Sequence, residues 1–386
     1  MSRLASLLIV LLAIAVATPV LAEDRLSLNG QMRVRGWHVD VDGADNTETW
    51  ADQRLRIGGK LSVAEGVSVT FRMDATEADW GKHTGFGSGR FTSDSNSMQW
   101  DRAHLDIEKN NLHLRAGQFY TTLGQTAFDA QDNGLMLNVK GQVPVSLFFM
   151  VDNDGGSRAD SDAYYYGANV GHKTDAYAAN VFVGGQKDDA EEVYVLGLNY
   201  AQTMDALKLF AEVDYFTGDA SATMDAYGLQ LFVDVSMAAS ETVTVGGQAF
   251  YAMGDEDDVQ YQILGNDFGG WDPTQALGTG LDNEKISLGR PFALLGNGAG
   301  IMAGRLYGDF MVASDLSLGA SVFYGVNDED SVALYESAMV VAGGVSYAVM
   351  ANTKLGVQLQ YWDFAGEGTN DDLEAMAAGM GLFVNF

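Results

Sequence analysis

The feature of this sequence that most limits its fold is a period of two in polarity, which is clearest over the last twelve residues, 375–386. Successive side chains of a β-strand point to opposite faces, so the pattern predicts a strand with one apolar face. A soluble sheet would have to cover that face with a second layer, whereas a transmembrane barrel turns it to lipid. The apolar residues of this stretch are Met376, Ala378, Met380, Leu382, Val384 and Phe386.

From Arg25 onward the same alternation recurs in short segments, whose connections are short and long by turns. Short connections are expected at 64–66, 109–111, 140–142, 172–174, 203–205, 238–240, 314–315 and 351–353. Longer, acidic ones are expected at 40–49, 80–97, 121–133, 153–162, 187–191, 217–224, 254–298, 327–337 and 365–374. Tight turns at one end and long loops at the other are typical of outer-membrane barrels. The sequence therefore predicts an all-β, transmembrane, antiparallel up-and-down barrel of about 18 strands, with about 16 as the alternative.

The amino terminus has the pattern of a secretory signal peptide. Arg3 precedes an apolar run over 4–16, and small residues lead to a cleavage position after Ala22. A retained anchor helix is the alternative, although the apolar run is short for one. We predict a signal peptide over residues 1–22 and a single outer-membrane barrel domain over 23–386.

Composition agrees with a chain that is mostly strand. There are 4 prolines, 46 glycines and no cysteine. Proline lacks the backbone donor that a paired strand needs, and a barrel closed by backbone hydrogen bonds does not depend on disulfides. The formal net charge of −30 excludes a nucleic-acid-binding protein, because the phosphate backbone attracts basic surfaces.

The two faces of the expected strands differ in a consistent way. One face is apolar and is expected to meet lipid. Its candidates are Leu55, Ile57, Leu61, Val67, Val69, Phe71, Val145, Leu147, Phe149, Leu229, Leu231, Val233, Leu316, Leu318, Val322, Leu355, Val357 and Leu359.

Charged residues occupy the opposite face and are predicted to line the pore. A basic wall on the first six strands is expected to face a more acidic wall across a wet pore. The alternative is that the arginines pair with nearby acids and stiffen the wall, as Arg72 could with Asp74 and Arg102 with Asp106. The predicted pore-lining residues are Arg33, Arg35, Arg54, Arg56, Lys60, Arg72, Arg102, Arg115, Lys140, Glu212, Asp214, Asp234, Arg305 and Asp309.

Two long connections, 254–298 and 80–97, are expected to fold inward and narrow the channel, with outward projection as the alternative. No catalytic residue, metal site or cofactor is predicted. The Gly-rich stretch 85–90 lacks the Gly-Lys-Ser/Thr ending of a phosphate-binding loop, and the acidic groups do not match a calcium loop. The 5 histidines have no metal-ligand spacing, and no serine lies in a Gly-x-Ser-x-Gly turn.

The signal peptide, the alternating strands and loops and the terminal Phe386 together resemble a Gram-negative outer-membrane porin. The stretch Arg115–Gly124, RAGQFYTTLG, is similar to a strand-to-loop segment of environmental porins, including the phosphate-selective and alginate-export groups. The lysine cluster of the phosphate group is not evident, and the acidic strands around Glu212 depart from an alginate exporter's basic lumen. The resemblance implies an outer-membrane location and contacts with lipid and lipopolysaccharide. It also implies that the barrel-insertion machinery reads the strand ending in Phe386, and it allows a homotrimer.

These observations predict a passive diffusion channel for small hydrophilic solutes or ions, and not an enzyme. The acidic external loops are expected to bias the pore towards cations. One alternative is a substrate-specific channel for an oligosaccharide, an organic acid or an exported polysaccharide, which would show saturable, solute-blocked conductance. Another is a non-conducting structural or adhesive barrel, which would carry no current.

Overall fold

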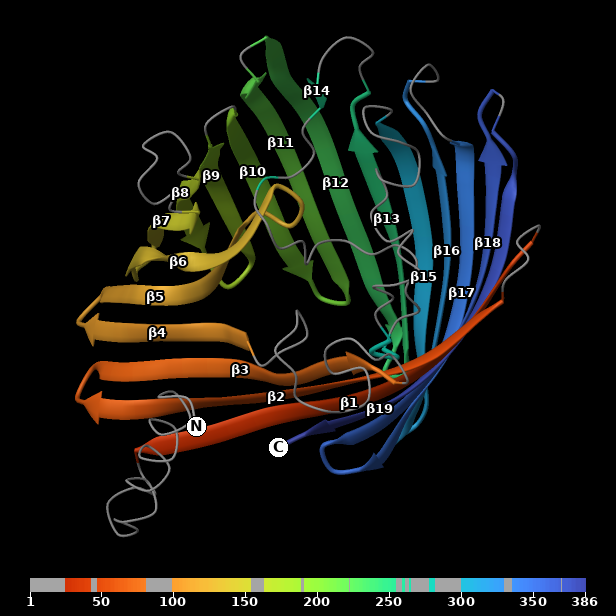
Figure 1. The fold of residues 1–386 in the computed structure, drawn as a ribbon, viewed down its shortest axis with the longest axis horizontal. Coiled ribbons are helices and arrows are strands. Elements are labelled where there is room, and N and C mark those ends of the chain that lie inside the picture. Colours follow the sequence, from red (N-terminus) through yellow and green to blue (C-terminus); the bar gives the residue numbers. More distant parts are fainter. Residues whose placement is uncertain are drawn as a thin grey trace.

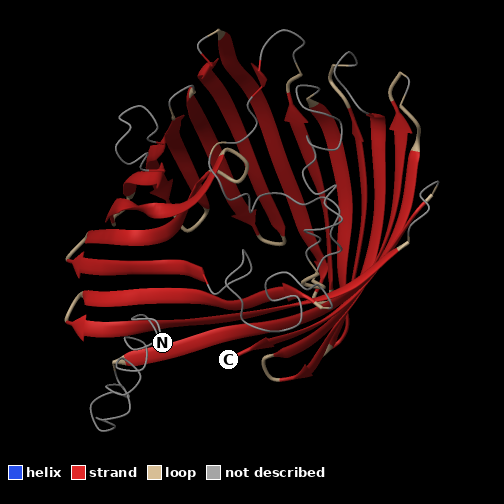
Figure 2. Ribbon diagram, viewed as in Figure 1, coloured by secondary structure: helices blue, strands red, loops and turns tan. Residues whose placement is uncertain are grey.

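The computed structural model describes residues 25–42, 47–80, 99–153, 163–188, 191–221, 223–254, 259–260, 264, 278–281, 300–329, 335–368 and 370–386. These residues are almost entirely strand (Figure 2). None of them belongs to a helix long and apolar enough to cross a membrane. The strands are β1 (Leu26–Val41), β2 (Glu48–Ala64), β3 (Val67–Asp79), β4 (Gln99–Lys109), β5 (Leu112–Leu123), β6 (Phe128–Val139), β7 (Val145–Asn153), β8 (Ala163–Lys173), β9 (Tyr177–Lys187), β10 (Glu192–Met204), β11 (Leu207–Ser221), β12 (Met224–Ser240), β13 (Val243–Ala252), β14 (Val259–Gln260), β15 (Ile301–Ala313), β16 (Leu316–Val326), β17 (Tyr335–Met350), β18 (Thr353–Gly366) and β19 (Leu373–Asn385).

The long strands close into one antiparallel barrel. Each pairs with its neighbours along the chain, and β1 pairs with both β2 and β19, so the first and last strands meet at a seam (Figure 1). The two-residue β14 is the exception, because it pairs in parallel with β12 and adds no strand to the wall. Within the described residues the wall has eighteen strands, which confirms the predicted up-and-down barrel and its strand count.

The short connections lie at one end of the barrel, with three of them shifted from the expected positions. The turns are at 174–176, 205–206 and 241–242, because β8 continues to Lys173, β10 to Met204 and β12 to Ser240. Asn110, Asp205 and Asn352 have φ of 55°, 51° and 62°. Tight hairpins need this left-handed conformation, which asparagine and aspartate tolerate better than most residues.

The predicted lipid-facing residues lie on the outer face of the wall. None of them is buried, and several large apolar side chains are more than half exposed, such as Leu306 at 72% and Leu359 at 61%. In water such a surface would drive association, whereas in a bilayer it matches the hydrocarbon. The period of two thus assigns the outer face correctly.

The prediction of a long external loop at 121–133 is wrong. β5 continues to Leu123, β6 begins at Phe128, and only a four-residue turn at 124–127 joins them. The ribbon of β5 and β6 curls into the barrel in front of β10 and β11 (Figure 1). We call residues 119–131 the inner hairpin. Its polar residues gave it the composition of a loop, but its apolar ones pack inside the barrel.

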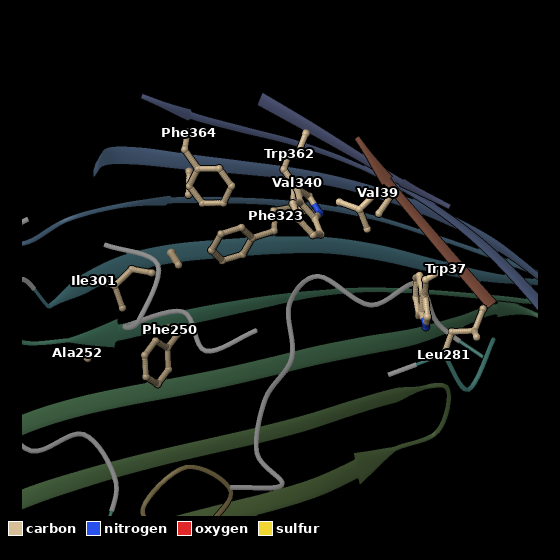
Figure 3. Close-up of a cluster of buried hydrophobic side chains, with 14 of the residues drawn as sticks. Trp37, Val39, Phe250, Ala252, Leu281, Ile301, Phe323, Val340, Trp362 and Phe364 are labelled. Atoms are coloured by element: carbon tan, nitrogen blue, oxygen red, sulfur yellow. The ribbon is translucent and has the colours of Figure 1, made fainter. Parts of the chain in front are cut away.

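Two apolar clusters explain how the interior is filled. The first lies on the inner faces of β12, β13, β15–β19 and β1, where aromatic side chains point inward from neighbouring strands (Figure 3). The second packs the inner hairpin against the wall through Phe119, Phe128 and Phe182, each at most 2% exposed. The interior is therefore narrower and more apolar than a uniformly polar pore.

Candidate functional site: the inner face of the barrel

Seven arginines form a continuous wall on the inner faces of β1 to β5. Arg33 lies directly opposite Arg54 in the β1–β2 register, and Arg72 lies opposite Arg102 in the β3–β4 register. Like charges at such positions repel, so a nearby acid or a bound anion is needed to offset them. The wall consists of Arg33, Arg35, Arg54, Arg56, Arg72, Arg102 and Arg115.

Aspartates on the same strands offset part of this charge. Arg35 donates from Nε to Asp52 at 2.9 Å, and both side chains are buried. Arg56 donates two hydrogen bonds to Asp74, at 2.7 and 3.1 Å. Asp74 therefore pairs with Arg56 rather than with Arg72, the partner expected from the sequence.

Arg72 and Arg102 instead share Asp101. Arg72 donates from both Nε and Nη2 to Asp101, the Nη2 bond being 2.7 Å, and Arg102 Nε lies 3.2 Å from the same carboxylate. The expected Arg102–Asp106 pair is thus replaced. The register between β3 and β4 shifts at Arg72, and this irregularity accommodates inward positions for both Asp101 and Arg102. Strict alternation places neighbouring residues on opposite faces, so the sequence pattern missed Asp101.

Asp106 is the centre of a second polar group on β3, β4 and β5. Its carboxylate accepts hydrogen bonds from Thr70 Oγ1 at 3.0 Å and from Arg115 Nε at 3.0 Å. His113 Nε2 lies 2.7 Å from it, and His104 Nδ1 lies 3.0 Å away. Two histidines and an arginine therefore surround one buried carboxylate near the end of β4 that leads into the short turn to β5.

The acidic side of the barrel holds the inner hairpin. Glu212 accepts hydrogen bonds from the backbone N–H of Gln125 at 2.7 Å and of Thr126 at 2.8 Å. The Thr126 hydroxyl lies 3.1 Å from the same carboxylate, and Asn199 Nδ2 donates to it at 3.2 Å. Glu212 is 4% exposed, so in this structure its carboxylate meets the hairpin tip and not an open lumen.

Asp214 and Gln230 complete this contact. Gln230 Nε2 donates to the Thr126 carbonyl at 3.0 Å and lies 3.3 Å from Asp214 Oδ2. Asp214 Oδ2 lies 3.2 Å from the Thr126 hydroxyl. Gln230 and Asp214 are each 1% exposed. Three side chains from β11 and β12 thus contact two residues of the hairpin tip, and Asn199 on β10 supports Glu212 from behind.

The remaining predicted residues are spread over other parts of the interior. Asp234 accepts hydrogen bonds from Gln248 Nε2 at 2.8 Å and from Tyr307 Oη at 2.7 Å. Buried Arg305 on β15 donates to Ser321 at 3.3 Å, and partly buried Asp309 follows on the same strand. Lys60 lies exposed on β2, and exposed Lys140 follows β6 in a turn, where it pairs with Glu108 at 2.7 Å.

Part of the long connection 254–298 lies inside the barrel. Leu264 forms an isolated parallel bridge with Phe128 of the inner hairpin. Thr279 donates to Gln358 on β18 at 2.8 Å, and Leu281 packs in the first apolar cluster. These described residues support the expected inward path of this connection. Residues 81–98, which include most of the other connection expected to fold inward, lie outside the described part of the chain, as do residues 1–24 with the predicted signal peptide.

A closed antiparallel wall of eighteen strands, apolar outside and charged inside, is the fold of the outer-membrane porins. The solved structures similar to this chain have that fold. Pseudomonas aeruginosa OpdO has a TM-score of 0.62 and 14% identity, with 94% of this chain and 98% of that chain covered. Pseudomonas aeruginosa OccK9 (OpdG) has a TM-score of 0.61 and 14% identity, with coverage of 94% and 99%.

Acinetobacter baumannii OccAB4 is also similar, with a TM-score of 0.58, 12% identity and coverage of 94% of this chain and 99% of that chain. No protein-family model matches the sequence, and no curated protein matches it either. The likeness therefore extends over nearly the whole length of each chain and concerns the fold.

Proposed function

We propose that this protein is an outer-membrane porin through which small hydrophilic solutes diffuse passively, and that it has no enzymatic activity. The observation that carries the proposal is the arginine wall on the inner face of a closed barrel whose outer face is apolar. Charge on a lumen face contacts water and solute, whereas at mid-bilayer on the outer face it would cost about 2–4 kcal/mol.

The inner face favours anions as the preferred solutes. Seven arginines are concentrated on β1 to β5, and like charges lie directly opposite each other at Arg33–Arg54 and at Arg72–Arg102. Glu212 and Asp214 are covered by the inner hairpin and do not balance this charge at the pore. This preference is opposite to the cation bias expected from the acidic loops. A substrate-specific channel for organic acids is the second candidate, because guanidinium groups bind carboxylates well.

Single-channel recording in a planar bilayer under a salt gradient tests the proposal. We expect discrete conductance steps and a reversal potential of anionic sign, which Arg102→Gln shifts towards cations. Lys140→Gln removes an equal charge from an exposed pair beyond the wall, and should shift the potential less. Absence of current from folded, heat-modifiable protein would favour the non-conducting barrel. Saturable block by a dicarboxylate would favour the organic-acid channel.

Three further partners belong to the same proposal. Lipid and lipopolysaccharide are expected around the exposed apolar belt. The barrel-insertion machinery is expected to recognise the last strand. In support, Phe386 exchanges backbone hydrogen bonds with Gly30 at 2.7 and 3.0 Å, and its side chain is 60% exposed. A homotrimer is the assembly to test, by crosslinking in native membranes.

A further inference from the structure

We propose that Glu212 and Asp214 are positioning residues that dock the inner hairpin by sharing one proton, so that docking weakens as pH rises. The inference rests on the proposed channel function only for its consequence, the width of the pore. The docking itself follows from the contacts at the hairpin tip. The hydrogen-bond donors at the hairpin tip are one too few to satisfy two ionised carboxylates.

The Thr126 hydroxyl shows this shortage of hydrogen-bond donors. It lies 3.1 Å from Glu212 Oε1 and 3.2 Å from Asp214 Oδ2, but a hydroxyl has only one proton to donate. Glu212 also receives two backbone N–H groups and the Asn199 amide, so it is well satisfied as an anion. Among the residues that the structure describes, the one other donor to Asp214 is Gln230 Nε2 at 3.3 Å, which is closer to the Thr126 carbonyl.

No cation offsets the two carboxylates within the described residues. The groups that face them are Gly124 to Thr126 of the hairpin, Asn199 and Gly197 on β10, Gln230 on β12 and the Phe182 ring on β9. No described lysine, arginine or histidine forms an ion pair with either carboxylate. Two buried like charges side by side are strongly disfavoured, and one carboxyl group then keeps its proton.

Asp214 is the carboxyl group that suits the neutral form. Its Oδ1 atom is buried without a hydrogen-bond partner. A Cβ atom placed at Gly197 would lie 2.4 Å from this oxygen and 2.0 Å from the Phe182 ring, so the ring and the oxygen are close neighbours. An ionised oxygen would lose its hydration there without compensation, whereas the carbonyl oxygen of a protonated acid loses less.

One proton on Asp214 allows Asp214, Thr126 and Glu212 to form a complete set of hydrogen bonds. Protonated Asp214 Oδ2 donates to Thr126 Oγ1, and the Thr126 hydroxyl then donates to ionised Glu212. Gln230 Nε2 donates to the Thr126 carbonyl. The docked hairpin thus binds a proton that the released hairpin gives up to water, so raising the pH favours release. Release would widen the lumen, and protonation would close it again.

The test uses a cysteine at Ala127, which is fully buried beside the hairpin tip in a chain that has no other cysteine. We expect the rate at which Ala127→Cys reacts with a membrane-impermeant maleimide to rise between about pH 6 and about pH 9, beyond the rise due to the thiol itself. The excess is at most about tenfold per pH unit for one proton. The same cysteine with Asp214→Asn supplies the thiol baseline and should show no excess, because an amide donates to Thr126 at any pH.

Three further variants separate docking from general destabilisation. Asp234→Asn removes a carboxylate from the neighbouring strand that has no contact with the hairpin, and the excess should persist. Thr126→Ser keeps the hydroxyl and the pH dependence, whereas Thr126→Val should remove the dependence. Equal pH profiles in the wild-type and Asp214→Asn backgrounds would overturn the proposal. So would labelling that follows added Ca²⁺ or a chelator instead of pH, since a bound cation would then hold the pair.

The labelling readout does not require current. A barrel that carries no current but shows the pH-dependent excess would support the docking mechanism while contradicting the porin function. A barrel that conducts but shows no pH-dependent excess would contradict the docking mechanism while supporting the porin function. In a conducting barrel we also expect single-channel conductance to increase with pH in the wild type, and not in Asp214→Asn.

Discussion

At the scale of single residues, Gly124 shows how closely the hairpin tip fits its acidic partner. Its φ is +70°, and an added Cβ atom would lie 2.6 Å from Glu212 Oε1. Gly124→Ala therefore combines a left-handed strain of about 1–2 kcal/mol with a direct clash. We expect a folded barrel with a displaced hairpin tip, seen as larger single-channel conductance and faster labelling at Ala127→Cys.

A second glycine provides the matched control for this substitution. Gly141 lies in the turn after β6, and nothing lies within 4 Å of an added Cβ atom. Gly141→Ala should leave both readouts unchanged. If Gly124→Ala also behaved like the wild type, the tip would be able to move without opening the lumen, and the hairpin would not set the pore width.

At the scale of one element, the inner hairpin extends beyond the pairing of β5 with β4, which ends at Gln118, and of β6 with β7, which begins at Asn133. Phe119 pairs with Asp132 across β5 and β6, so an Asn-Gly turn in place of residues 120–131 would close the ladder at that pair. We expect the shortened barrel to insert and to conduct several times more current, because the second apolar cluster loses the part that occupies the lumen. Planar-bilayer recording measures this directly.

A substitution in a turn at the other end of the barrel is the control for the effect of changing a turn as such. Replacing Glu241 and Thr242 with Asn-Gly changes a turn that joins β12 and β13 and does not enter the lumen. Its conductance should match that of the wild type. A shortened barrel with unchanged conductance would place the narrowest part of the pore elsewhere, for example at the segment 278–281.

At the scale of the whole molecule, the outer face is stable only in a medium that matches it. Leu306 lies within β15 and is 72% exposed, so Leu306→Arg places a charge in the hydrocarbon. We expect the free energy of unfolding in lipid vesicles to fall by about 2–4 kcal/mol. Leu112 is 46% exposed at the start of β5, on the face opposite inward-pointing His113, and Leu112→Arg should cost about 0–1 kcal/mol there. Equal losses at the two positions would contradict this placement of the bilayer.

The alternation of apolar and polar residues predicted the barrel wall well, because the residues of each strand themselves show which face meets lipid. Leu61, Val69 and Val357 alternate with small or polar neighbours, and the structure places all three on the outer face. The same rule failed at Asp101, where a shifted register alters strict alternation. It also failed on β15–β19, where inward residues such as Phe323 and Trp362 are apolar as well, so the inner face cannot be recognised by polarity alone.

The sequence by itself determined a closed barrel of about 18 strands, its apolar outer face and its clustered arginines, because periods of two and alternating loop lengths are local properties. Only the tertiary structure decided which acid each arginine contacts and that residues 119–131 enter the lumen. Glu212 and Gln125 are far apart along the chain, and their contact depends on barrel closure bringing β11 opposite the hairpin. Glu212, which the sequence predicts to line the pore, thus binds the tip of the inner hairpin that occupies the lumen.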